Sequence, residues 1–272
     1  MRLPARLYRQ FDADDARPVP AEGFGGWHEV EVDLDPARTA LVVMHAWDAQ
    51  RPGVHPGWDR TVEYRARARR ILADVFPRLL AAVRASPVPV LHVVGGGDYY
   101  RHLPGYRRAV ALAGQQPDPR PVPADPSWQR LQALRRREGF PGGHNAADIA
   151  RGFAALDFAP EARPVGDEGV AENAAQLGAL CRERGINHLV YAGFALNWCL
   201  LMSPGGMVDM ARLGCLCSTI EEAVTAVENR ETAAEEREKA QALWRVALEF
   251  GFVFRLAPFL AALPRGRIGP PS

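Results

Sequence analysis

Four short apolar runs stand out along the chain, at residues 39–44, 88–94, 188–192 and 215–220. The first and the third are almost continuously apolar, which is typical of strands buried on both faces of a parallel sheet. Three consecutive glycines, at 95–97, end the second run. We therefore expect these runs to form the central strands of one buried sheet.

Between the runs, apolar residues recur at helical spacing. The clearest case is 62–85, where Ile71, Leu72, Val75 and Leu79 share one face. Further helices are predicted at 127–137, 170–184, 199–213 and 232–250. Glycines at 185 and 214 are good C-terminal caps for two of them. Because Ser203 and Pro204 form a typical helix start, a new helix beginning there is an alternative.

Strand and helix alternate along most of the chain, which predicts an α/β fold with a mainly parallel sheet and helices on both faces. Residues 1–38 are rich in Pro, Gly and Asp and are expected to form an N-terminal arm with one strand, at 27–32. Residues 39–272 then form the α/β domain. Its irregular segment at about 99–150 is rich in proline and aromatic residues, and we interpret it as an insertion or lid.

Right-handed crossovers place the carboxyl ends of parallel strands on one edge of the sheet, where open α/β folds bind ligands. That edge is expected to gather His45, the segment 92–98 and the segment 196–199. Cys199 follows a buried strand and lies near a predicted helix start, a position that favours the nucleophilic thiolate form. A small buried residue filling a gap is the alternative interpretation of Cys199.

The block Gly193-Phe-Ala-Leu-Asn-Trp-Cys199 resembles the isochorismatase-like cysteine hydrolases, as do the segments 40–48, 209–214 and 223–228. The resemblance covers residues 39–252 and implies a Rossmann-like three-layer α/β/α fold, usually in a homo-oligomer such as a dimer or tetramer. It also implies hydrolysis of small amides or related C–N bonds through a cysteine nucleophile, here Cys199, with no cofactor.

The resemblance further implies a cis peptide at Ala195–Leu196 and an oxyanion hole formed by the backbone N–H groups of Leu196 and Cys199. Two positions depart from the family pattern. His45 stands where the family has an aspartate, and Glu172 is the residue closest to the family's lysine position. The chain therefore resembles a divergent branch that lacks the usual Asp and Lys.

Three functions remain open at this point. His45 is a candidate base for Cys199, since histidine suits proton transfer near neutral pH. In the second alternative, His45 acts as an acid or base without a covalent intermediate. In the third, the protein is a non-catalytic homologue that binds a small metabolite or a partner.

Five further residues are candidates for substrate binding: Trp47, Asp48, Tyr99, Asn197 and Trp198. The two tryptophans follow strand ends, where they are placed to wall a pocket for a flat substrate or simply to pack. Asp48 either orients His45, binds substrate or caps a following turn. Asn197 is also placed to hold its turn through side-chain to backbone hydrogen bonds.

The histidines lack the spacing of a metal site, so we expect no metal, and His92 is predicted to be a core residue bonded to backbone. Formal net charge is +1, with 33 basic and 32 acidic residues, which gives no reason to expect nucleic acid as a partner. The arginine clusters 65–70 and 135–137 and the mixed acidic and basic run 230–239 are interpreted as solvated helix faces. Because no long apolar stretch is present, the sequence favours a cytoplasmic protein with no membrane partner. No two cysteines have C-x-x-C spacing, and those at 215 and 217 are expected to be small buried residues.

Overall fold

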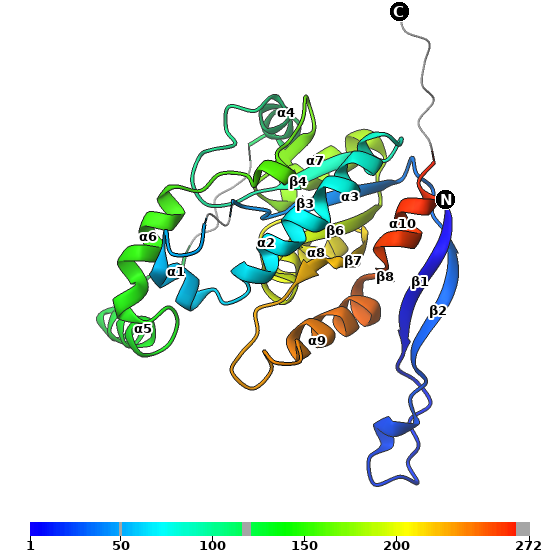
Figure 1. The fold of residues 1–272 in the computed structure, drawn as a ribbon, viewed down its shortest axis with the longest axis horizontal. Helices are drawn as coiled ribbons and strands as arrows, with labels where there is room; N and C mark the ends of the chain where they lie inside the picture. The colour runs from blue at the N-terminus through cyan, green and yellow to red at the C-terminus, as the bar shows by residue number, and fades with distance from the viewer. Residues whose placement is uncertain (49–50, 116–120, 265–272) are drawn as a thin grey trace, which may run out of the picture.

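A mostly parallel sheet runs through the middle of the molecule (Figure 1). The computed structural model describes residues 1–48, 51–115 and 121–264, and within them eight strands follow the order β2-β1-β8-β7-β6-β3-β4-β5. The strands from β8 to β5 in this order are parallel, while β1 pairs antiparallel with both β2 and β8. Their bounds are β1 Arg2–Arg9, β2 Gly26–Asp33, β3 Thr39–Met44, β4 Val90–Val93, β5 Gly169–Ala171, β6 His188–Phe194, β7 Leu216–Thr225 and β8 Val253–Phe254.

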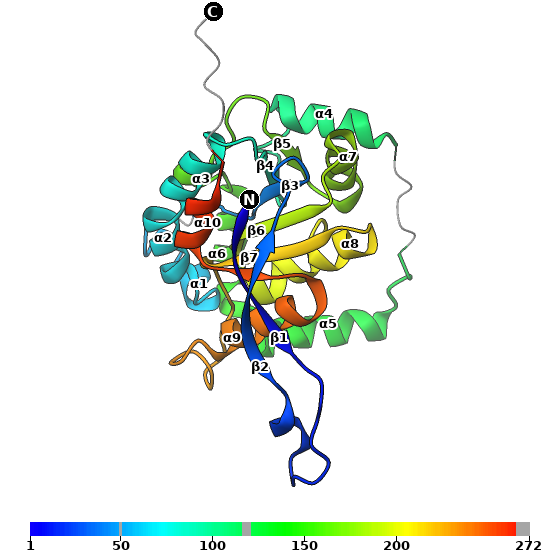
Figure 2. The same cartoon turned by 90° about the vertical axis from the view of Figure 1, so that its right-hand side faces the viewer.

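Helices cover both faces of this sheet, so the predicted three-layer α/β/α architecture is confirmed. Figure 2 shows α2, α3 and α10 on one side of the sheet and α7 and α8 on the other. The helices are α1 Pro56–Thr61, α2 Arg65–Asp74, α3 Phe76–Arg84, α4 Pro104–Ala113, α5 Pro126–Glu138, α6 Ala146–Ala154, α7 Ala174–Arg184, α8 Met207–Arg212, α9 Arg237–Arg245 and α10 Leu256–Ala262.

Strand β3 shows why its sequence is continuously apolar. Its six residues are all buried. Leu41 and Val43 pack on one face into a core that includes Phe76 of α3, whereas Val42 packs on the opposite face into a core that includes Leu177 of α7. Because successive side chains of a strand point to opposite faces, a strand between two helical layers needs an apolar residue at every position.

The N-terminal arm contains one strand more than the pattern predicted. β1 and β2 form a hairpin, and Arg6 of β1 pairs with Val253 of β8, which extends the central sheet. Only Leu3 and Ala5 of β1 are fully buried. The apolar signal of β1 is therefore too short to distinguish it from an extended arm.

Three predicted helices differ from the structure. Residues 169–171 form strand β5, and α7 starts at Ala174 after Asn173, whose side chain accepts a hydrogen bond from the Gln176 N–H at 3.0 Å. Residues 62–85 form two helices, α2 and α3. The predicted helix at 199–213 is replaced by a helical turn, Leu196–Leu200, and a separate helix α8.

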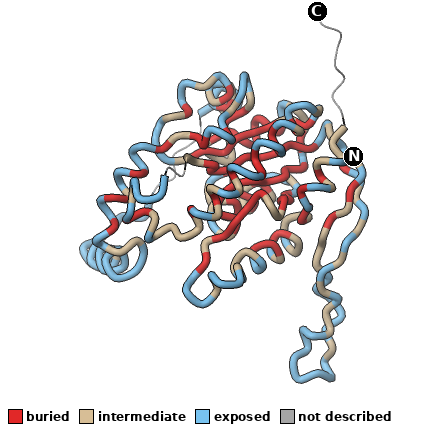
Figure 3. The backbone as a smooth tube through the Cα atoms, viewed as in Figure 1, coloured by how far each residue is buried: buried red, intermediate tan, exposed pale blue. Residues whose placement is uncertain are grey.

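Two segments extend away from the buried layers. Figure 3 shows buried residues concentrated in the sheet and in the helix faces against it, while α5 and the end of the β1–β2 hairpin are exposed. In the described part of the chain, no helix combines the length and the apolar character needed to cross a membrane.

Candidate active site

The carboxyl ends of β3 and β6 open into an aromatic pocket of about 220 Å³. Five residues singled out from the sequence line it together: His45, Trp47, Asp48, Trp198 and Cys199. His45 to Asp48 follow β3, and the other two lie in the turn after β6. The sheet therefore brings residues about 150 positions apart in the sequence into one cavity, as the edge rule for parallel sheets predicts.

Cys199 is positioned by the turn that follows β6. The cis peptide lies at Phe194–Ala195 and not at Ala195–Leu196, so the predicted position was wrong by one residue. The chain then enters the helical turn Leu196–Leu200, which the carbonyl of Ala195 closes by accepting a hydrogen bond from the Leu200 N–H at 3.1 Å. The Cys199 side chain is half-buried and lines the pocket.

The predicted oxyanion donors, the backbone N–H groups of Leu196 and Cys199, are the first and fourth of this turn. In the described residues, neither Leu196 nor Cys199 donates a backbone hydrogen bond to a carbonyl outside the turn. The first N–H groups of any helical segment lack partners within it. Both predicted oxyanion donors therefore belong to the turn that carries the thiol, although Leu196 itself is fully buried.

Asn197 anchors the opposite side of the same turn. Its side-chain amide donates to the carbonyl of Val227 at 2.8 Å, and its side-chain oxygen accepts from the N–H of Val227 at 2.9 Å. The predicted side-chain to backbone role is thus confirmed. Asn197 does not line the pocket of Cys199 but a second cavity behind the turn, so its side chain positions the turn instead of facing the thiol.

His45 lies immediately after β3 in a left-handed backbone conformation, with φ of 49°. Its ring stacks on Trp47, with centroids 4.5 Å apart and planes inclined by 14°. A Cβ at Gly95 would lie 3.2 Å from Nε2 of His45, so a glycine leaves room for the ring. Burial lowers the pKa of His45 from 6.5 to about 4, and the carbonyl of Val94 opposes this shift. The imidazole is therefore neutral at pH 7.

Trp47 links the pocket to a second layer of aromatic side chains. Its Nε1 donates a hydrogen bond to the Tyr99 hydroxyl at 2.8 Å. Tyr99 does not itself line the pocket and packs instead against Tyr100 and Phe158. Tyr99, predicted to bind substrate, therefore fixes the position of the Trp47 ring from behind.

Sequence reasoning missed Arg65, which lines the same pocket and is only 4% exposed. Its guanidinium lies 4.4 Å from the centre of the Trp58 ring and 3.2 Å from a carboxylate oxygen of Asp59. The interpretation of 65–70 as a solvated face is wrong for this residue. Its helical spacing to the buried Ala68 and Leu72 is the signal that would have revealed it.

Tyr64 was also missed and brings a hydroxyl near the thiol. Burial raises the pKa of Tyr64, and the negative charge of a Cys199 thiolate raises it further. The phenol therefore stays protonated in the pocket that it lines with Cys199. Phe140 and Pro141 from the insertion and Phe153 of α6 complete the wall of the pocket.

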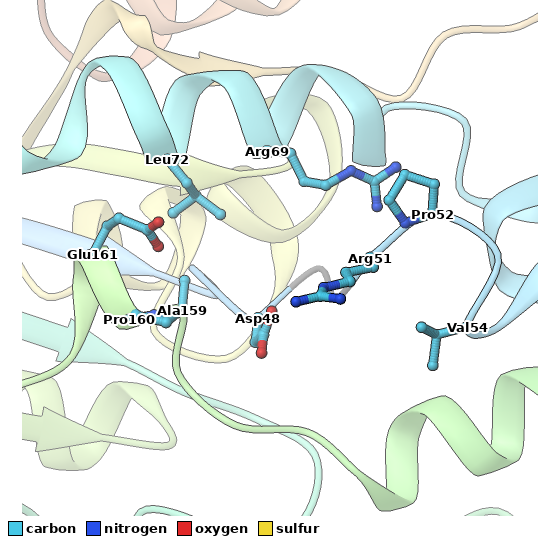
Figure 4. A pocket seen from close by; sticks show the side chains of 9 residues that line it. All are labelled: Asp48, Arg51, Pro52, Val54, Arg69, Leu72, Ala159, Pro160 and Glu161. Carbon is cyan, nitrogen blue, oxygen red and sulfur yellow. The ribbon is translucent and has the colours of Figure 1, made fainter.

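A wider outer cavity of about 630 Å³ adjoins the aromatic pocket of Cys199, and Asp48 lines both. Figure 4 shows Arg51 and Arg69 on one side of this outer cavity and Glu161 on the other, with Asp48 between them. The Arg69 guanidinium also lies 3.8 Å from Asp59. The inner cavity is thus aromatic, and the outer one is charged.

Two other polar groups near the sheet edge lie outside the pocket. His92 is buried in β4, and its Nε2 lies 2.9 Å from a carboxylate oxygen of Glu168. The prediction of a core histidine is confirmed, but its partner is a carboxylate and not backbone. Glu172 accepts hydrogen bonds from the hydroxyls of Tyr100 and Tyr106 at 2.8 and 2.9 Å. In the described residues, no three His, Cys, Asp or Glu side chains gather as a metal site would require.

The fold is that of the cysteine hydrolases. A cysteine hydrolase from Pseudomonas syringae pv. phaseolicola aligns with a TM-score of 0.52 and 17% identity, over 84% of this chain and 93% of that chain. An isochorismatase family protein from Burkholderia thailandensis aligns at 0.45 and 18%, over 85% and 97%. An isochorismatase-like hydrolase from Alkaliphilus metalliredigens aligns at 0.46 and 16%, over 84% and 99%.

Sequence comparisons add nothing to this structural likeness. No protein-family model matches the chain, and no curated protein matches it. The resemblance in fold that the sequence predicted is therefore confirmed through the structure alone.

Proposed function

We propose that this protein is a divergent cysteine hydrolase that cleaves the C–N bond of a small aromatic amide. One observation carries the proposal: the Cys199 thiol and the His45 imidazole line a single aromatic pocket at the ligand-binding edge of the sheet. Aromatic walls from Trp47, Trp58 and Phe153 suit a flat acyl group.

In the proposed reaction, His45 takes the proton of the Cys199 thiol, and the sulfur attacks the carbonyl carbon. The negative charge that develops on the carbonyl oxygen is held by the N–H groups of Leu196 and Cys199, where one donor is commonly worth about 3 kcal/mol. Collapse of this intermediate breaks the C–N bond, and the departing amine takes the proton from His45. Water, deprotonated by His45, then hydrolyses the thioester and regenerates the thiol.

The low pKa of His45, about 4, keeps its imidazole neutral at pH 7 and therefore free to accept a proton. A buried imidazolium is costly by itself, because burial disfavours the charged form. Asp48 lines the same pocket, and in the proposal its negative charge offsets the positive charge of His45 while His45 carries the proton. Asp48 thus takes part in the proposal as an electrostatic partner of His45.

The covalent step is tested with an activated aromatic ester, p-nitrophenyl benzoate, and intact-protein mass spectrometry. We expect one benzoyl group on Cys199, together with release of amine from a panel of aromatic amides. Cys199→Ala removes both signals and lowers turnover by about 10³-fold or more. Cys215→Ala, which changes another half-buried thiol, is the matched control and leaves both unchanged.

The outcome separates the three functions that the sequence left open. Turnover retained in Cys199→Ala without an adduct would replace covalent catalysis by acid–base catalysis at His45. Absence of both the adduct and turnover in the wild-type protein, over a broad panel, would contradict the proposal and favour a binding protein.

A further inference from the structure

Helix α5 presents an apolar stripe that nothing in the described chain covers. Trp128, Leu131 and Leu134 are spaced by three residues and are therefore neighbours on one face of the helix. They are 53%, 64% and 47% exposed, and no residue of α5 is buried. An apolar surface of this kind on an otherwise polar helix is typical of an interaction site.

The same helix is strongly basic. It carries Arg130, Arg135, Arg136 and Arg137 against a single acid, Glu138, which gives a net charge of +3. Arg137 is paired with Glu138 at 2.6 Å, whereas no ion pair involves the other three arginines within the described ranges. The partner that fits α5 therefore combines apolar side chains with negative charge.

The hairpin loop, residues 10–25 between β1 and β2, has this complementary chemistry. It carries four acids against one arginine, for a net charge of −3, in a molecule whose total is only +1. Arg17 is already held by Asp14 at 3.0 Å, while no ion pair of the described chain involves Asp12 or Asp15. Phe11 and Val19 of the same loop are 57% and 54% exposed.

Within one chain these two surfaces do not meet. Figures 1 and 2 show that α5 and the hairpin loop extend from the same side of the molecule, at opposite ends of its long axis and at similar depth. A two-fold rotation about an axis between them places each hairpin loop beneath α5 of the other copy. The contact is then reciprocal and closed, as in most homodimers.

We infer that a second copy of this chain covers α5: its acidic hairpin loop docks on the basic, apolar face of the helix, and the exchange is reciprocal. Exposed aromatic and leucine side chains supply the apolar centre, and the arginines and aspartates supply a charged rim.

The docked loop would also support the wall of the candidate active site. α5 leads directly into Phe140 and Pro141, which line the pocket of Cys199. The Phe140 ring contacts Trp198 edge to face at a centroid distance of 5.5 Å. A partner bound to α5 therefore restrains the segment that closes this side of the pocket.

Sedimentation velocity tests the contact without any need for turnover, so the test is independent of the proposed function. We expect the full-length protein to dimerise between about 1 and 100 µM, more weakly at about 0.5 M NaCl than at 0.1 M because salt screens exposed charges. The variant Arg135→Glu/Arg136→Glu should weaken the dimer at least about tenfold. Adding Asp12→Lys/Asp15→Lys to the same chain should restore most of the affinity.

Both surfaces are exposed, so these variants should fold normally, which circular dichroism checks. Arg70→Glu/Arg107→Glu reverses two other exposed arginines and serves as the matched control, with an unchanged dimer. Trp128→Ser tests the apolar stripe separately and should also weaken the dimer. A monomeric wild-type protein up to 100 µM, or a dimer that none of these variants changes, would overturn the inference.

A cross-link identifies the contact directly. A chain with Ala13→Cys, mixed with a chain with Ser127→Cys, should form a disulfide-linked pair under mild oxidation, since both positions are exposed and Ser127 lies on the same helix face as Leu131 and Leu134. Wild-type chains, which keep the four native cysteines, are the control and should stay unlinked. Failure of the mixed chains to cross-link while the dimer persists would place the interface elsewhere and reject the hairpin loop as the occupant.

Discussion

His45 directly follows β3 and His92 lies within the neighbouring strand β4, yet their surroundings differ. Both are buried, and burial lowers the pKa of both. His92 bonds to Glu168, which Arg84 holds in turn at 2.8 Å. His45 stacks on Trp47 and faces the pocket of Cys199. A pKa that burial lowers thus accompanies both a structural histidine and a candidate base, and only the neighbours distinguish them.

The largest expected effect is on turnover. His45→Ala should lower kcat of aromatic amide hydrolysis by about 10² to 10⁴-fold, because general-base catalysis commonly contributes this much. His92→Gln should keep turnover within a few-fold. It should lower the free energy of unfolding by about 1–3 kcal/mol, since it weakens the hydrogen bond between a buried ring and the half-buried Glu168 carboxylate.

Steady-state kinetics and urea unfolding of the two variants measure this pair of effects. A His92→Gln enzyme that loses as much turnover as His45→Ala, at equal stability, would erase the contrast between the two histidines.

The pH dependence of stability should be the property that the two histidines share. A histidine with a folded-state pKa below its unfolded value stays neutral in the fold, whereas the unfolded chain takes up a proton below pH 6.5. The contribution of such a histidine to the free energy of unfolding is complete above pH 6.5 and is lost as the pH falls toward 4. For His45 the fall in pKa from 6.5 to about 4 corresponds to about 3 kcal/mol of unfolding free energy.

Urea unfolding at pH 7 and at pH 4.5 measures this loss. His45→Gln should reduce the difference in unfolding free energy between the two pH values by up to about 3 kcal/mol. His92→Gln should change it in the same direction. His28→Gln, at an exposed part of the N-terminal hairpin, is the control and should leave the difference as in wild type. An unchanged difference in His45→Gln would mean that His45 is not buried as described.

The contrast also shows which parts of the molecule the sequence reveals. Strands such as β3 were predictable, since burial between two helical layers requires apolar residues without interruption. His45, Trp47 and Cys199 were predictable because each lies within a few residues of the carboxyl end of such a strand. Arg65 was not singled out, because an arginine among other arginines gives no sign of burial unless its register with Ala68 and Leu72 is considered.

Roles that depend on distant partners could not be predicted. Nothing local shows that the Asn197 amide pairs with Val227, or that Tyr99 faces the back of Trp47. Both contacts join segments that only the folded sheet brings together. The pocket wall at Phe140 has the same origin, since it comes from the irregular insertion and not from a strand end.

The smallest expected effect concerns the support of His45 by its stacked ring. Trp47→Phe keeps an aromatic face against His45 but removes the Nε1 donor to the Tyr99 hydroxyl, a hydrogen bond worth about 1 kcal/mol. We expect KM to rise by a few-fold with little change in kcat, because the ring loses its fixed position while the thiol and the imidazole stay. Tyr99→Phe removes the same hydrogen bond from the other partner and should give a similar rise. If Tyr99→Phe behaves as wild type while Trp47→Phe does not, the tryptophan contributes to the pocket through the size of its ring. His45 would then differ from His92 because an aromatic ring packs on it, and the hydrogen bond between Trp47 and Tyr99 would have no part in that difference.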